Sequence, residues 1–135
     1  MHDTHKIDGK KKSHLGGIIK WNLVSRILCG CKGIRYAWRA ERSFRNQVFG
    51  LAAMVATLSI IQPKLLWWGL ALMASLTAIS FEMLNSSLES LADHLHPDHH
   101  PKIGKVKDLA CGAVIVSSFG LLFIGIAMIV DTLWG

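Results

Sequence analysis

The sequence predicts an all-α membrane protein in which three transmembrane helices follow an N-terminal amphipathic surface helix. Three observations support this class. Hydrophobic residues make up 51% of the 135 residues and charged residues only 18%, against about 25% in typical soluble domains. Basic residues outnumber acidic ones by 15 to 9. The charges are also segregated along the chain, which leaves long apolar blocks between them.

The same composition excludes other classes. Intrinsic disorder requires low hydrophobicity, which this chain lacks. A disulfide scaffold requires more than the three cysteines present. No apolar run appears before residue 48, so we expect no cleavable secretory signal. The basic excess does not imply nucleic-acid binding, because a membrane surface explains it.

The apolar blocks define the expected membrane helices. Lys64 is the single charge within residues 48–81, and residues 109–135 contain only Asp131. We expect a tight turn at Gln62-Pro63-Lys64, because proline removes a helix hydrogen bond and lysine resists the bilayer centre. A spanning helix needs about 20 apolar residues. We therefore predict transmembrane helices over about 44–61, 65–90 and 108–131.

The N-terminal region divides into two parts. Residues 1–13 are polar and are expected to be a disordered tail, whereas residues 14–135 are expected to form one membrane domain. Apolar residues recur every four positions from Leu15 to Ile27, and basic residues lie between them. This pattern predicts an amphipathic helix over 14–40 that lies on the membrane surface.

The loop charges predict the orientation. With a cytoplasmic N-terminus, every basic residue except Lys64 lies on the inner side, as the positive-inside rule requires. The C-terminus then lies on the outer side. Trp67, Trp68 and Trp134 would lie near the outer interface, where amphipathic rings are favoured. We expect a multi-pass protein of the bacterial cytoplasmic membrane.

A polar stripe after the second apolar block indicates the chemistry. At 100° per residue, one helix face carries Glu82, Asn85, Ser86, Glu89 and Asp93. Ionisable groups at membrane depth are costly and usually functional. Glu82 and Glu89 are roughly 10 Å apart along a helix, so they could act on different atoms of one substrate. The structural alternative is a stripe that only drives oligomerisation, although small residues usually do this.

Two further patterns lie beyond the stripe. Lys107-Asp108 precedes the last apolar block, where it could bind a phosphate or simply begin a helix. A histidine cluster makes a metal site conceivable, but its spacing matches no structural zinc pattern. The cluster consists of His94, His96, His99 and His100. Walker A and protein-kinase motifs are absent from the sequence, so any phosphotransferase here is not of a common type.

The combined motifs resemble a known family. Glu-Met-Leu-Asn-Ser-Ser-Leu-Glu at 82–89, Asp93 and Gly-Lys-Val-Lys-Asp at 104–108 resemble the small membrane-integral diacylglycerol kinases of bacteria. Lys-Gly-Ile-Arg-Tyr-Ala-Trp at 32–38, with Glu41 and Phe44-Arg45, is also similar to that family. The resemblance spans about residues 30–118 and includes the related undecaprenol kinases.

The resemblance implies an ATP-dependent lipid kinase that forms homotrimers with active sites between subunits. It implies that Glu82 is the general base, that Glu41 and Glu89 hold Mg²⁺ on ATP, and that Asn85 supports this site. Nucleotide contacts are implied for Asp98, His100, Lys107 and Asp108. Lipid contacts are implied for Arg35, Trp38, Phe44, Arg45 and Cys111.

The resemblance specifies the acceptor lipid less closely than it specifies the fold and the reaction. Diacylglycerol, converted to phosphatidic acid, is the expected substrate. Residues 107–114, with Cys111 where better-known members have serine, and residues 41–45 lean toward undecaprenol kinases, so undecaprenol is the alternative. Two other classes are a non-catalytic trimeric adaptor and a small cation transporter. The transporter is disfavoured because the acidic residues gather at one membrane face.

Overall fold

The computed structural model describes residues 23–98 and 100–134. The described chain contains four helices and no strand, which confirms the all-α prediction. They are α1 (Leu23–Ala40), α2 (Arg42–Ile61), α3 (Leu65–Leu95) and α4 (Pro101–Trp134). The expected tail over residues 1–13 and the expected helical residues 14–22 lie outside the described part.

The chain divides into two compact units at Ile34 and Arg35, inside α1. In the first unit, the described part of α1 carries exposed apolar side chains, including Leu23, Val24 and Ile27. The second unit contains the end of α1 and the three long helices. Each of α2, α3 and α4 is long and apolar enough to span a membrane, as the sequence predicts.

A tight turn joins α2 and α3 at the predicted position. Gln62 adopts the left-handed conformation, with φ of 53°, and its backbone N–H donates to the Leu58 carbonyl over 2.9 Å. This bond satisfies one of the last free carbonyls of α2. Pro63 follows, and Lys64 precedes the first residue of α3. The turn therefore makes α2 and α3 an antiparallel hairpin.

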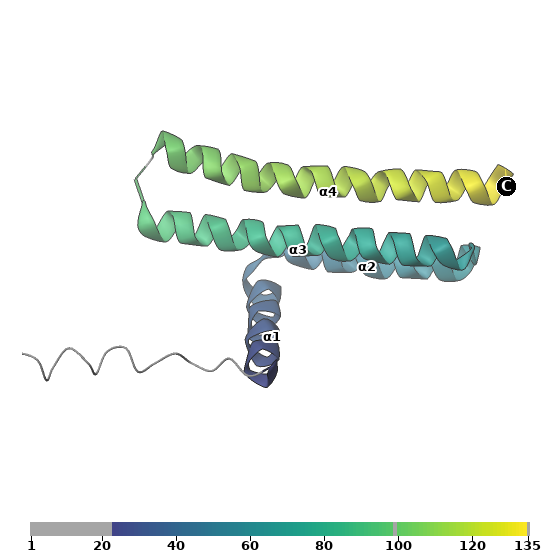
Figure 1. Ribbon diagram of the computed structural model, residues 1–135, viewed down its shortest axis with the longest axis horizontal. Coiled ribbons are helices and arrows are strands. Elements are labelled where there is room, and N and C mark those ends of the chain that lie inside the picture. The colour runs from purple at the N-terminus through teal and green to yellow at the C-terminus, as the bar shows by residue number, and fades with distance from the viewer. Residues whose placement is uncertain (1–22, 99, 135) are drawn as a thin grey trace, which may run out of the picture. The chain divides into compact units, whose positions relative to one another are not determined.

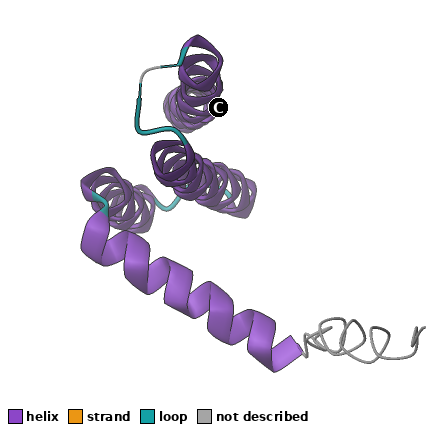
Figure 2. Cartoon of the chain, turned by 90° about the vertical axis from the view of Figure 1, so that its left-hand side faces the viewer, coloured by secondary structure: helices purple, strands orange, loops and turns teal. Residues whose placement is uncertain are grey.

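Helix α3 packs against both α2 and α4, and Figure 1 shows α3 and α4 running side by side. Small residues of α3 are buried at Ala71, Ser75 and Ala78, at the spacing of one helix face. Small side chains let membrane helices approach closely. Glu82 continues this buried seam with 6% exposure. Figure 2 shows the three long helices nearly end-on.

The innermost core lies in the half of the unit near the α2–α3 turn. Leu58 is completely buried and clusters with Ala71 and Met128. Most other large apolar side chains of the spanning helices are exposed, including Phe119 and Phe123 of α4. In a membrane such surfaces contact lipid or another chain, so their exposure agrees with three spanning helices.

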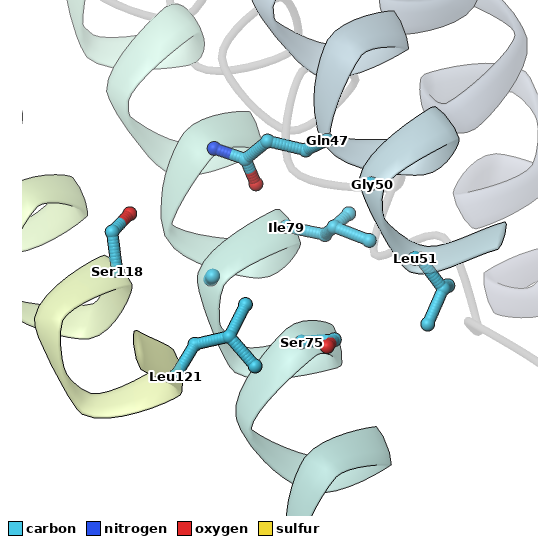
Figure 3. Close-up of a pocket in the computed structure, with 8 residues that line it drawn as sticks. Gln47, Gly50, Leu51, Ser75, Ile79, Ser118 and Leu121 are labelled. Carbon is cyan, nitrogen blue, oxygen red and sulfur yellow. The ribbon is translucent and has the colours of Figure 1, made fainter. Parts of the chain in front are cut away.

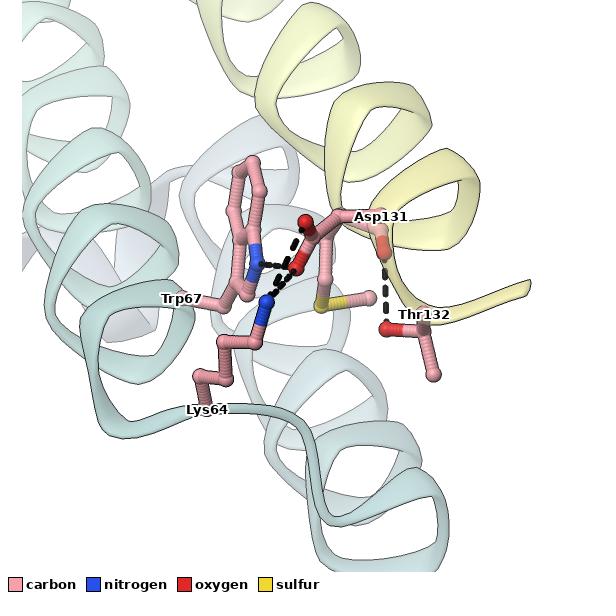
Figure 4. Close-up of polar contacts among 5 residues, drawn as sticks. Lys64, Trp67, Asp131 and Thr132 are labelled. Atoms are coloured by element: carbon pink, nitrogen blue, oxygen red, sulfur yellow. Dashed lines mark hydrogen bonds and ion pairs between the residues drawn. The ribbon is translucent and has the colours of Figure 1, made fainter. Parts of the chain in front are cut away.

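The α3–α4 pair is linked by charged contacts at both ends. At the end near the turn, the Lys64 ammonium lies 3.2 Å from Asp131 Oδ2. The Trp67 indole N–H also donates to that oxygen, over 2.9 Å (Figure 4). At the opposite end, the Lys107 ammonium pairs with the Asp93 carboxylate. The sequence gives Trp67 only an interfacial position and assigns no partner to Asp131.

Helix α4 begins earlier than expected. The sequence predicts a transmembrane segment from about residue 108, but the helix starts at Pro101. Proline suits the first helical position because the missing N–H needs no partner there. The first two turns are polar, so a hydropathy argument does not detect them. They extend α4 beyond the apolar block and bring Lys107 opposite the end of α3.

Candidate active site

The polar stripe of α3 lies on one helix face, as predicted. Asn85 Nδ2 donates to Glu89 Oε1 over 2.8 Å, a contact one helical turn apart. Both side chains are half-buried, whereas Glu82 is buried. The stripe therefore presents one buried carboxylate nearer the membrane interior and an amide–carboxylate pair nearer the end of the helix.

The pair formed by Asn85 and Glu89 has unused acceptor capacity. Asn85 Oδ1 is buried and has no hydrogen-bond partner among the described residues. A buried acceptor without a partner is costly and is commonly matched by water, an ion or a ligand. Carboxylate and amide oxygens are suitable ligands for Mg²⁺. The donor set therefore fits a magnesium ion, although no three His, Cys, Asp or Glu groups gather as a metal cluster in the described ranges.

Glu41 lies at the junction of α1 and α2, where the sequence resemblance places a metal ligand. It precedes the first residue of α2 in an extended conformation, and its side chain does not cap that helix. The carboxylate is half-buried. Among the described residues, no hydrogen bond that caps α2 occupies this carboxylate.

A polar cavity of about 210 Å³ lies where α3 ends and α4 begins. It brings together three of the predicted nucleotide residues, Asp98, His100 and Lys107, and adds Asp93 and His96. The Lys107 ammonium pairs with Asp93 across the two helices. Asp108, the fourth predicted residue, is exposed on the first turns of α4 and does not line this cavity.

The histidine cluster lies around the same loop. His96 and His100 have ring centroids 5.9 Å apart. His100 Nδ1 accepts a hydrogen bond from the backbone N–H of Lys102 over 3.2 Å, and so helps to begin α4. His94 is in the last turn of α3, and His99 lies outside the described residues. Within the described part, these histidines contribute to no metal-binding group.

The predicted lipid residues divide between two places. At the α1–α2 junction, Arg45 Nη1 donates to the Trp38 carbonyl over 3.0 Å, and the Trp38 ring lies 6.0 Å from that of Phe49. Phe44, next to Arg45 in the sequence, is buried with 4% exposure, and Arg35 is exposed. The junction therefore groups Trp38, Phe44 and Arg45. Cys111 is exposed on α4, outside this group.

The sequence reasoning missed one residue that contacts the stripe. Gln47 of α2 donates from Nε2 to Glu82 Oε2 over 3.1 Å. A polar side chain just inside the first apolar block is the signal that could have identified it. Gln47 also lines a cavity of about 240 Å³ between α2, α3 and α4 (Figure 3).

The comparisons with known proteins identify the family. The family model for prokaryotic diacylglycerol kinase matches residues 28–129. A diacylglycerol kinase of Helicobacter pylori is 31% identical over 67% of this chain and 69% of its own length. One of Escherichia coli is 26% identical over 64% of this chain and 70% of its own. An undecaprenol kinase of Bacillus subtilis is 29% identical over 73% of this chain and 83% of its own.

The chain therefore belongs to the prokaryotic diacylglycerol kinase family. It is a kinase held in the membrane by three helices, and the kinase class implies the use of ATP. The relatives of this chain include proteins named diacylglycerol kinase and a protein named undecaprenol kinase.

Proposed function

We propose that this protein transfers the γ-phosphoryl group of ATP to the hydroxyl of diacylglycerol, giving phosphatidic acid. The observation that carries the proposal is the state of Glu82. Its carboxylate is buried, and the hydrogen bond that it accepts comes from a neutral amide of α2. Among the described residues Glu82 therefore has no cation partner, and it is placed as a candidate general base.

Glu82 also lies at a suitable depth. It is 17 residues after Leu65, the first residue of α3, which corresponds to roughly 26 Å along the helix. The hydrocarbon core is about 30 Å thick. With the α2–α3 turn at the outer surface, Glu82 lies near the cytoplasmic boundary, where the hydroxyl of a lipid alcohol resides.

Each side chain has its own role in the proposed reaction. Glu82 takes the proton of the lipid hydroxyl, whose oxygen forms a bond to the γ-phosphorus while the bond from that phosphorus to ADP breaks. Lys107 places positive charge beside the transferring phosphate. To do so, it must exchange its contact with Asp93 for phosphate oxygens. Asp98 and His100 line the cavity beside Lys107, and Asp108 is proposed to contact the adenine side.

Glu41, Glu89 and Asn85 would hold Mg²⁺. When bound there, the ion would supply positive charge against the phosphate oxygens. The two carboxylates suit this ion, because Mg²⁺ commonly binds one or two carboxylates and completes its shell with water and phosphate. The free Asn85 Oδ1 beside Glu89 supports this assignment.

The active site is proposed to be completed by a second chain in a homotrimer. Asp93, which holds Lys107, lies 11 residues beyond Glu82 on α3, or roughly 16 Å along the helix. One phosphoryl group cannot easily contact Lys107 and a hydroxyl at Glu82 of the same chain across that separation. A neighbouring chain packed on the exposed apolar faces would supply the missing side.

The proposed topology has a cytoplasmic N-terminus and an outer C-terminus. This orientation keeps the ATP-binding end of α3 and α4 in the cytoplasm, where the nucleotide is available. It also leaves Lys64 as the single outer basic residue of the sequence. Arg35, Trp38, Phe44, Arg45 and Cys111 are proposed to contact the lipid.

Undecaprenol is the second candidate acceptor. The similarity to the Bacillus subtilis undecaprenol kinase extends over 83% of that protein, which is a larger share than for the diacylglycerol kinases of Helicobacter pylori and Escherichia coli. The chemistry at Glu82 is the same for either lipid alcohol.

One assay tests the proposal and its alternatives. Purified protein in detergent with Mg²⁺ and labelled ATP is offered diacylglycerol or undecaprenol in parallel. We expect labelled phosphatidic acid, and a fall in kcat of about a hundredfold or more for Glu82→Gln, the range of general-base catalysis. Ser87→Ala is the control, because Ser87 is exposed and bonds only its own helix at Met83.

The other outcomes are informative. Preferential labelling of undecaprenol would reassign the acceptor. No transfer to either lipid by a folded trimer would favour the non-catalytic adaptor. Ion flux without ATP would favour the cation transporter. Near-normal turnover by Glu82→Gln would remove Glu82 from the role of base.

A further inference from the structure

A hydrogen bond between side chains links α2 to the proposed base on α3. Gln47 Nε2 lies 3.1 Å from Glu82 Oε2, and the two residues are 35 positions apart in the sequence. Glu82 is 6% exposed. A hydrogen bond to a charged group in such surroundings is stronger than one at the surface.

The Gln47 amide presents its N–H to Glu82. The other end of the amide, Oε1, is buried and has no hydrogen-bond partner among the described residues. Figure 3 shows the Gln47 side chain reaching over the cavity between α2, α3 and α4. Turning the amide over would place Oε1 against the carboxylate, and two acceptors would then face each other. The amide is therefore held by its bond to Glu82.

A neutral donor suits a general base better than a cation would. A glutamate side chain has several rotatable bonds, and efficient proton abstraction requires one defined geometry. An amide N–H fixes one carboxylate oxygen without placing a positive charge beside it. With Oε2 held by Gln47, Oε1 of Glu82 is the oxygen left to receive a proton.

We propose that Gln47 is a positioning residue of this kinase, which holds Glu82 Oε2 so that Oε1 faces the lipid hydroxyl. Gln47 acts through Glu82 and touches no reacting atom. The inference rests on the proposed function, since it assigns the partner of the proposed base. It predicts that kcat depends on a hydrogen-bond donor at residue 47, and that a side chain with only the shape of glutamine does not suffice.

The test compares two replacements at residue 47. Gln47→Leu keeps a similar volume and removes the donor, whereas Gln47→His keeps a neutral N–H of comparable reach. We expect Gln47→Leu to lower kcat by about 10- to 100-fold, the worth of a hydrogen bond to a charged group. The KM for ATP should change by less than about twofold, because Gln47 does not contact the nucleotide cavity. Gln47→His should recover most of the lost kcat.

Ser118→Ala is the matched control. Ser118 lines the same cavity as Gln47, but its hydroxyl donates to the Val114 carbonyl of its own helix over 2.8 Å. Its replacement should leave kcat unchanged. Equal losses in Gln47→Leu, Gln47→His and Ser118→Ala would show that general packing matters, and would overturn the inference.

An infrared measurement separates this inference from the proposed function. The carboxylate stretch of Glu82 is identified as the band lost in Glu82→Gln. We expect this band to move in Gln47→Leu and to return toward its original position in Gln47→His, whether or not lipid is phosphorylated. An unmoved band would refute the contact. Inactive wild-type protein with a shifted band would refute only the proposed function.

Discussion

Burial distinguishes Glu82 from the other acidic side chains of α3. Glu89 is half-buried and accepts a hydrogen bond from Asn85, whereas Asp93 is exposed and pairs with Lys107. The three carboxylates therefore have three kinds of partner, which are an α2 amide, an amide of the same helix, and an ammonium of α4. This difference supports separate roles as base, metal ligand and holder of the phosphate-binding lysine.

Lys107→Met tests the nucleotide end of the site. The change removes the positive charge proposed to contact phosphate, so kcat/KM for ATP should fall by about 10- to 100-fold. Initial rates at varied ATP and saturating lipid measure this effect. Lys105→Met is the control, because Lys105 is exposed two positions away and does not line the cavity. Equal effects of the two changes would mean that only the general positive charge matters.

Sequence reasoning reaches contacts within one helix more readily than contacts between helices. The Asn85–Glu89 bond follows from a spacing of four residues. The Gln47–Glu82 and Lys107–Asp93 contacts depend on how far each helix is shifted along its neighbour. That shift is determined by the turn and by core packing, which no local pattern specifies. The sequence alone therefore does not predict that Gln47 contacts Glu82.

At the scale of elements, α3 and α4 are held in register by the two charged contacts at their opposite ends. In the ion pair near the turn, the two side chains differ in their exposure to solvent. Lys64 has a 71% exposed side chain, whereas that of Asp131 is 33% exposed. Exposed ion pairs contribute about 0–1 kcal/mol. The bond from the Trp67 indole, which is part-buried, is therefore expected to contribute more than the ion pair.

Two variants at this end separate the contributions. Asp131→Leu removes both contacts and leaves the Trp67 N–H without its acceptor, so the free energy of unfolding should fall by about 1–3 kcal/mol. Lys64→Met removes only the ion pair and should cost less than about 1 kcal/mol. Thermal unfolding in detergent measures both. A larger loss for Lys64→Met would mean that the ion pair dominates.

The helices themselves were largely predictable, and their ends were not. Apolar blocks interrupted at Gln62-Pro63-Lys64 indicate a hairpin because a bilayer demands long apolar segments. The same argument does not predict that α4 starts at Pro101. Its first turns leave the apolar block, and hydropathy reports only the part of a helix that contacts lipid. Those polar turns carry Lys107, so the missed segment is part of the candidate site.

At the scale of the whole molecule, the described chain leaves much apolar surface uncovered. Phe119 and Phe123 of α4 and Phe49 of α2 are each more than half exposed. Lipid can cover such residues, and so can neighbouring copies. The separation between Glu82 and the end of α3 favours copies, because a second chain can bring its own lysine or carboxylate to the base.

Mixed trimers test this arrangement. Glu82→Gln chains lack the proposed base, and Lys107→Met chains lack the proposed phosphate contact, so on this proposal neither forms a complete site alone. If each site draws these two residues from different subunits, co-assembled mixtures should regain activity above that of either pure variant. Radiolabelled lipid formation after mixing and reassembly measures the recovery. Activity no higher than the average of the two variants would place both residues in one subunit.

The hairpin of α2 and α3 has a consequence for how such an enzyme recognises its substrate. In the proposed topology the turn at Gln62 marks the outer surface, and Glu82 lies roughly 26 Å along α3 from Leu65, the first residue of that helix. This distance is nearly the thickness of the hydrocarbon layer. In this topology the length of α3 places the proposed base at the level where lipid hydroxyl groups lie. On this proposal the enzyme selects an alcohol by its depth in the bilayer, and the lipid tail stays in the hydrocarbon layer. That principle accommodates lipids as different as a glyceride and a polyprenol within one architecture.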